Sequence, residues 1–164
     1  MKYILIIFYF LITFQAYNFE YTRTISGKRT IITSFDITEE EKFVNFVLDG
    51  TFTDNLGNYG YSKSNTTVLL NKSDVMRLEG FGKYTFQNKE VFYTRGVRNK
   101  QEQNSGVGEN EIIGATGSLK ELIGMKCTYA IKFLEDYYFW IQKCEITENQ
   151  KNFMKMLSLK IRKC

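Results

Sequence analysis

The chain contains no proline and no histidine among its 164 residues, and it has only three cysteines. The lack of histidine excludes Ser-His-Asp triads, histidine-ligated metal sites and the side chain that usually titrates near neutral pH. After the first 16 residues there is no apolar run long enough to span a membrane as a helix. No catalytic constellation rises above background, so we expect no catalytic residue, no cofactor and no metal site.

The first 16 residues have the pattern of a secretory signal peptide. Lys2 supplies the positive charge, residues 3–14 form the apolar run, and Ala16 is the small residue before the expected cleavage point. An uncleaved anchor is the alternative, but the run is shorter than the roughly 20 residues that a spanning helix needs. The pattern predicts an exported protein, periplasmic or secreted, with a mature chain of residues 17–164.

Positive charge is concentrated at the C-terminal end. Residues 147–164 carry five basic residues and one acid, whereas residues 17–146 carry 16 basic residues and 17 acids. A body without net positive charge disfavours a nucleic-acid partner. The basic extension 147–164 could make weak contact with a membrane surface or a polyanion, or act as a solubilising tail. Its pattern allows a helix over 149–164 or a last strand at 156–161.

The composition favours β-structure, with 11 tyrosines and 14 phenylalanines. Short alternating segments are separated by turn signals. In the segment 75–86, one face would carry two inward glycines that leave space or let the strand bend; this face consists of Met76, Leu78, Gly80, Gly82, Tyr84 and Phe86. We predict a single all-β domain over 17–146, an antiparallel up-and-down barrel of about eight strands, with a polar loop at 96–110.

Two cysteines lie symmetrically about one short turn at Glu135-Asp136. Pairing the flanking strands about that turn places Cys127 directly opposite Cys144. Facing residues of an antiparallel pair have Cβ atoms roughly 4.5–5.5 Å apart, which a disulfide can bridge after small adjustment. The pair predicts a disulfide and an oxidising compartment. Cys164 is left as a free thiol or an intermolecular link.

The cysteine face of this hairpin is rich in large apolar side chains. It could be a packed core or the lining of a pocket for a small apolar ligand. Arg95 joins this lining if its face of the strand at 90–98 turns inward, and lies on the surface if the register is shifted by one residue. The candidate lining residues are Tyr84, Arg95, Tyr129, Ile131, Phe133, Tyr138 and Trp140.

The segment 113–119, IGATGSL, followed by Leu122 and Gly124, resembles the glycine-rich signature of small calycin-like barrels. That group includes the allene oxide cyclase and dirigent barrels and small secreted bacterial proteins of unknown function. Residues 50–60 are similar to an early hairpin of the same group, so the resemblance covers 43–146 and implies a calycin-like barrel. The residues themselves predict that Leu119 and Leu122 plug one barrel end and that Gly124 lets the chain leave.

These observations favour a small exported barrel that binds a small apolar ligand or an envelope partner without catalysis. One alternative is an isomerase or cyclase of the allene oxide cyclase type, which needs a buried acid inside the barrel. Asp49 and Glu79 fall on the faces opposite the apolar ones and do not supply it. The other alternative is a structural or surface-interaction protein that uses the basic tail.

Overall fold

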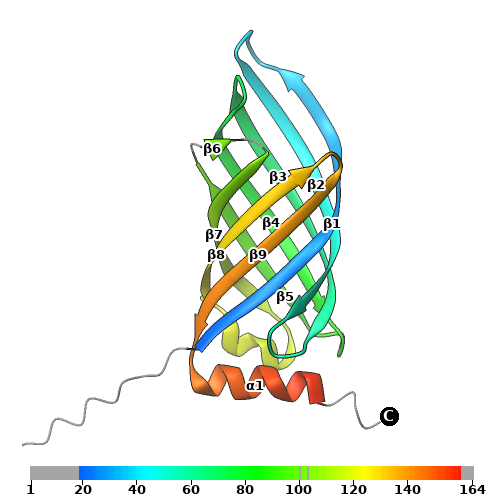
Figure 1. Cartoon of the computed structure of the whole chain (residues 1–164), viewed down its shortest axis with the longest axis vertical. Coiled ribbons are helices and arrows are strands. Elements are labelled where there is room, and N and C mark those ends of the chain that lie inside the picture. The colour runs from blue at the N-terminus through cyan, green and yellow to red at the C-terminus, as the bar shows by residue number, and fades with distance from the viewer. Residues whose placement is uncertain (1–18, 100, 103, 160–164) are drawn as a thin grey trace, which may run out of the picture.

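The computed structural model describes residues 19–99, 101–102 and 104–159. They form a closed, eight-stranded, antiparallel up-and-down barrel with a helix across one end (Figure 1). The expected all-β barrel of about eight strands is confirmed. The expected signal peptide and Cys164 lie outside the described residues.

Consecutive strands are neighbours around the barrel wall. The wall consists of β1 (Phe19–Asp36), β2 (Glu41–Asp54), β3 (Tyr59–Asn71), β4 (Asp74–Phe86), β5 (Val91–Arg98), β7 (Ser105–Ala115), β8 (Lys126–Leu134) and β9 (Tyr137–Ile146). A two-residue strand, β6 (Gln101–Glu102), pairs with the start of β4. The barrel closes where β1 pairs with β9, from Phe19–Ile146 to Lys28–Tyr137.

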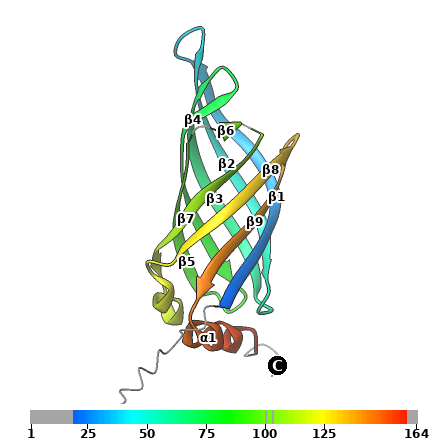
Figure 2. The ribbon, with the colours of Figure 1, turned by 60° about the vertical axis from the view of Figure 1, so that its left-hand side comes forward.

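One end of the barrel is taller on one side than on the other. β1 pairs with β2 as far as Asp36 but with β9 only as far as Lys28. The hairpins of β1–β2 and β3–β4 therefore project beyond the β8–β9 turn, as Figures 1 and 2 show. We call this the upper end, and the end that carries the helix the lower end.

The lower end is closed by two helical segments. The 3-10 helix η1 (Gly117–Leu122) buries Leu119 and Leu122 completely, which confirms the expected plug. The helix α1 (Glu148–Leu159) buries Met154 and Leu157, and Asn58 Nδ2 donates a 3.1 Å hydrogen bond to the Met154 carbonyl. The tail therefore takes the helical alternative, and its apolar face covers the barrel floor.

Local chemistry explains where η1 begins and where it ends. Gly117 and Gly124 have φ values of 54° and 87°, in the left-handed region that favours glycine. The Glu90 carboxylate accepts hydrogen bonds from the backbone N–H groups of Ser118 and Leu119 at 3.1 and 3.3 Å. A Cβ on Gly117 would lie 2.6 Å from that carboxylate, so the corner requires glycine there.

The basic tail is partly occupied by packing. Lys151 Nζ lies 3.1 Å from the Glu148 carboxylate and 4.7 Å from the centre of the Phe19 ring. Lys160, Arg162 and Lys163 lie outside the described residues, and contact with a polyanion stays a prediction. Within the described ranges, no helix is both long and apolar enough to cross a membrane.

Two local expectations are wrong. Met76 is 43% exposed, because a register shift near Leu69–Leu70 puts Val75 inside in its place. The segment expected as a polar loop contains the first half of β7, and Gly108 there is required by packing. A Cβ on Gly108 would lie 2.5 Å from the ring of Tyr129, so only glycine fits this inward position.

The cysteine hairpin has the expected register. β8 and β9 pair from Cys127–Cys144 to Leu134–Tyr137, and the two cysteines form a disulfide. The bond lies at the lower end, next to the closing pair of β1 and β9. It therefore joins two neighbouring wall strands close to the seam of the barrel.

Replacing both Cys127 and Cys144 by alanine should lower the free energy of unfolding by about 3 kcal/mol, because the cross-link no longer restricts the unfolded chain. Urea denaturation followed by tryptophan fluorescence measures this. The wild-type protein under reducing conditions is the matched control and should unfold like the double variant. Unchanged stability of both would contradict a stabilising role for the bond.

Candidate ligand cavity

The barrel interior is not completely filled. An inner cavity of about 40 Å³ lies among residues that face inward from seven of the strands. A single water needs roughly 10–15 Å³ on such a measure, so this space exceeds one water. Its lining residues are Phe46, Leu48, Ser64, Thr66, Leu78, Gly80, Gly82, Tyr84, Thr94, Gly96, Arg98, Asn110, Tyr129, Ile131, Phe133 and Trp140.

A larger cavity of about 270 Å³ adjoins it toward the upper end. The two share four lining residues: Phe46, Leu78, Arg98 and Phe133. The larger cavity is also lined by Arg29, Ile31, Val44, Val68, Val75 and Asn104. Ile31 and Asn104 are exposed, so this cavity reaches solvent at the upper end, whereas η1 and α1 cover the lower end.

Most of the lining residues predicted from the sequence are where we expected them. Tyr84, Tyr129, Ile131, Phe133 and Trp140 all line the inner cavity. The Tyr129 and Trp140 rings stack with centroids 4.0 Å apart and so form one continuous apolar wall.

Tyr138 shares the inward face but contributes to packing. It is 2% exposed and lines neither of these two cavities. Its hydroxyl oxygen would lie 2.5 Å from a Cβ at Gly50, so this phenol fills the space beside a glycine of β2. Burial raises the pKa of Tyr138 to about 12, although a hydrogen bond with Ser62 acts in the opposite direction.

Of the two alternatives for Arg95, the surface position holds and the pocket-lining position is wrong. Its side chain is 52% exposed on the outer wall, and its Nε lies 2.7 Å from the Glu79 carboxylate on the neighbouring strand. Hydrogen bonding to Arg95 holds the pKa of Glu79 below its usual value. The register is the shifted alternative, in which Phe92 and Thr94 point inward.

The same shift places Arg98, which we did not predict as a site residue, inside the barrel. Arg98 is 3% exposed, lines both cavities and lies on the inward face of β5, whereas Arg95 lies on the outward face. Burial lowers the pKa of Arg98, and the neighbouring Tyr129 acts against that shift. The signal that could have located it is the alternation of positions 92, 94, 96 and 98.

Small residues create the inner space. Gly80 and Gly82 of β4, which the sequence predicted to face inward, line it together with Gly96 of β5. A Cβ on Gly82 would lie 2.8 Å from the Thr94 hydroxyl, whereas a Cβ on Gly96 would meet its nearest neighbours only at 3.8 Å. A Cβ on Gly96 would therefore make ordinary contacts beside the inner cavity, so a larger side chain could extend into that space.

A second buried arginine lies behind the wall of the inner cavity. Arg23 is 0% exposed, and its guanidinium carbon lies 4.3 Å from the Tyr84 ring centre and 4.6 Å from that of Phe92. None of its guanidinium nitrogens has a hydrogen-bond partner among the described residues. The negative faces of aromatic rings compensate part of the charge. Arg23 therefore helps to fill the lower barrel and adds positive charge behind Tyr84.

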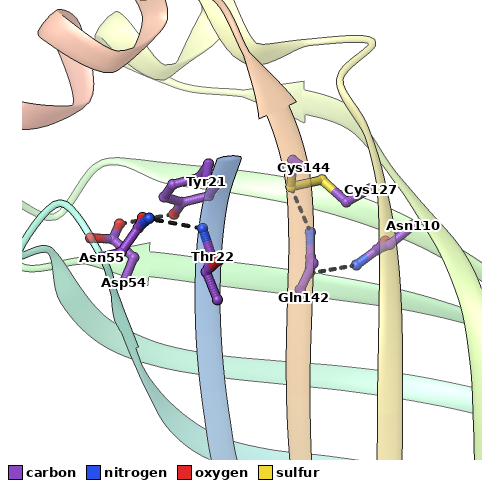
Figure 3. Close-up of a disulfide and its surroundings, with 8 residues drawn as sticks. All are labelled: Tyr21, Thr22, Asp54, Asn55, Asn110, Cys127, Gln142 and Cys144. Atoms are coloured by element: carbon purple, nitrogen blue, oxygen red, sulfur yellow. Dashed lines mark hydrogen bonds between the residues drawn. A yellow bond between two sulfur atoms is a disulfide. The ribbon is translucent and has the colours of Figure 1, made fainter. Parts of the chain in front are cut away.

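Polar side chains below the cavity are tied to one another. Figure 3 shows Asn110 Nδ2 donating to Gln142 Oε1 at 3.3 Å, and Gln142 Nε2 donating to the sulfur of Cys144 at 3.6 Å. On the other side of β1, the Tyr21 hydroxyl donates to Asp54 at 2.8 Å. These bonds fix the floor beneath the cavity.

Among the described residues, no aspartate and no glutamate lines either cavity. Two polar atoms of the inner lining, Trp140 Nε1 and Asn110 Oδ1, are buried without a hydrogen-bond partner among the described residues. Unsatisfied buried polar atoms are costly and call for an explanation. In the same part of the chain, no group of three or more His, Cys, Asp or Glu side chains could hold a metal ion.

Comparisons of the chain with protein-family models, with curated proteins and with solved structures found no match. The resemblance of residues 43–146 to calycin-like barrels therefore stays a prediction.

Replacing Arg23 by alanine should lower the free energy of unfolding by about 3 kcal/mol, because it leaves a hole among four rings. Replacing it by methionine should cost less than about 1.5 kcal/mol, because this side chain fills much of the space and removes a buried charge. Urea titrations of both variants measure the difference. Equal destabilisation by the two substitutions would show that the charge, and not the volume, holds the rings.

The buried phenols predict an alkaline limit to stability. Burial raises the pKa of both Tyr129 and Tyr138 to about 12 from an ordinary 10.0. Between these values the unfolded chain releases protons that the folded chain keeps, so the free energy of unfolding should fall as the pH rises from 10 toward 12. Urea titrations across this range and tyrosinate absorbance measure it. Ionisation of every tyrosine near pH 10 in the folded protein would contradict the burial argument.

Proposed function

We propose that this protein is an exported binding protein that holds a small, largely apolar organic molecule inside its barrel without transforming it. The observation that carries this proposal is the pair of adjoining cavities, closed below and reaching solvent above. Ligand sites are concave, mostly apolar and furnished with a few polar groups, and these cavities have that character.

The wall is suited to binding because its rigid parts surround the hollow. The aromatic rings of Tyr129 and Trp140 stack on each other, and the Phe46 and Phe133 rings meet edge to face with their centroids 6.1 Å apart. Large rings held by their neighbours lose little freedom when a ligand arrives, which favours affinity. The polar side chains of Thr66 and Thr94 offer hydrogen bonds that orient a ligand.

Export is supported by the disulfide and by the pattern of the first 16 residues. A disulfide between Cys127 and Cys144 fits an oxidising environment, such as the periplasm or the outside of the cell. The cyclase alternative lacks support within the cavities, because their linings contain no carboxyl group to act as the buried acid.

Filling the inner cavity tests the proposal. Replacing Gly96 by valine places two methyl groups in the space, without a close clash for its Cβ. We expect at least a tenfold loss of affinity for N-phenyl-1-naphthylamine, together with unchanged or higher stability. This neutral apolar fluorescent probe is too large for the inner cavity alone and would extend into it from the upper cavity.

Replacing Gly114 by valine is the matched control. A Cβ there would meet the ring of Tyr93, which is exposed on the outer wall, at 3.7 Å. This variant should bind the probe like the wild type. Absence of probe binding by the wild type, or equal binding by the Gly96 variant, would overturn the proposed function.

A further inference from the structure

We propose that the ligand is a monoanionic amphiphile that enters with its acid group first. Its carboxylate or sulfonate would lie in the inner cavity at Arg98, and its apolar body would lie in the larger upper cavity. This inference rests on the proposed function and adds the chemical class and the orientation of the ligand.

The inner cavity fits an acid group better than it fits an apolar one. Its volume of about 40 Å³ suits a small group, and Arg98 lines it as a cation. Trp140 Nε1 is a buried donor without a hydrogen-bond partner among the described residues. The hydroxyls of Ser64, Thr66 and Thr94 line the same space. Charge-assisted hydrogen bonds from such donors to an anion are stronger than neutral ones.

The upper cavity fits an apolar body. It is larger, at about 270 Å³, and four aliphatic side chains form much of its wall: Val44, Val68, Val75 and Leu78. Burial of a hydrocarbon against this wall is favourable at roughly 25 cal/mol per Å² of apolar surface. Because Arg98 lines both cavities, it lies where the acid group of the ligand would join its apolar body.

The positive charges around the two cavities also favour an anionic ligand. Arg98 and Arg29 line the cavities, Arg23 lies 4.3 Å behind the Tyr84 wall, and no acidic side chain lines either space. Arg29 Nη2 donates to the Glu135 carbonyl at 3.0 Å, while its buried Nε has no hydrogen-bond partner among the described residues. These arginines give the two cavities a positive potential, which attracts an anion.

A single negative charge fits better than two. Desolvation of an anion in such a space is expensive, and the cost grows with charge. One carboxylate or sulfonate can accept from Arg98 and from Trp140 Nε1. We therefore expect monoanions with one apolar body to bind more tightly than dianions of the same size.

The test compares octanoate with 1-octanol as competitors of N-phenyl-1-naphthylamine on the full mature protein. These two molecules share the same chain and differ in the acid group. In the wild type we expect octanoate to displace the probe at a concentration at least tenfold lower than 1-octanol does. Replacing Arg98 by methionine should bring the two concentrations within about threefold, because the charge-assisted hydrogen bonding of the acid group to Arg98 is lost.

Replacing Arg95 by methionine is the matched control. It removes an arginine from the same strand, three residues away, but from the outer wall. This variant should keep the wild-type preference for octanoate. Should the Arg98 variant fail to fold, replacing Trp140 by phenylalanine removes only the Nε1 donor and the indole's second ring. It should weaken octanoate binding severalfold and leave 1-octanol binding nearly unchanged.

The outcomes separate the two proposals. Probe binding that 1-octanol and octanoate displace equally well in the wild type would overturn the anion inference and leave the proposed function standing. A wild-type protein that binds neither the probe nor octanoate, measured by calorimetry, would overturn both. If the Arg95 variant loses the preference for octanoate as fully as the Arg98 variant does, the preference comes from attraction of octanoate to the protein surface. That result would also overturn the inference.

Discussion

The pairing of β1 with β9 is the constraint on which the interior of this barrel depends. Ladder hydrogen bonds from Phe19–Ile146 to Lys28–Tyr137 close the wall, so side chains alternate between interior and solvent around the whole circumference. A slip of one residue in any strand would exchange its two faces. Closure thus keeps Arg23 and Arg98 inside, where neither would stay in an open sheet that could shift its register.

The closed wall is filled unequally from one end to the other. Below, the rings of Phe52, Tyr84, Phe86 and Phe92 pack at centroid distances of 5.0 to 5.9 Å, and η1 and α1 cover them. Above, inward positions of the middle strands are Gly80, Gly82, Gly96 and short hydroxyl side chains. The cavity therefore arises from the order of large and small residues along each strand, and its opening direction follows from which end carries the helical segments.

Sequence reasoning located the parts of the fold that are set by short-range symmetry. The hairpin about Glu135-Asp136, its cysteine pair and the plug of Leu119 and Leu122 each depend on residues close in the chain. The inward face of β5 could not be predicted in this way, because both faces of the strand carry large apolar residues. Val91, Tyr93 and Val97 lie on one face, and Phe92 lies on the other. In the structure Phe92 and Thr94 are buried on the inner face, and Arg95 pairs with Glu79 of the neighbouring strand outside. The inner cavity itself depends on the side-chain volumes that seven strands contribute, which no single segment of the sequence reveals.

Arg23 and Arg98 are both buried cations, but they are buried for different physical reasons. The guanidinium of Arg23 lies within 6.0 Å of four ring centres and lines neither of the two cavities, so the rings take the place of an anion and the residue is part of the packing. Arg98 instead lines the junction of two spaces, the larger of which reaches solvent, so a molecule entering from the upper end can meet it. Both arginines contribute positive potential to an interior in which no acidic residue of the described chain lines the cavities. Arg23 therefore adds to the potential that an anion would meet at Arg98. The aromatic rings that hold Arg23 therefore affect the electrostatic potential of the cavity above them, in addition to closing the barrel below it.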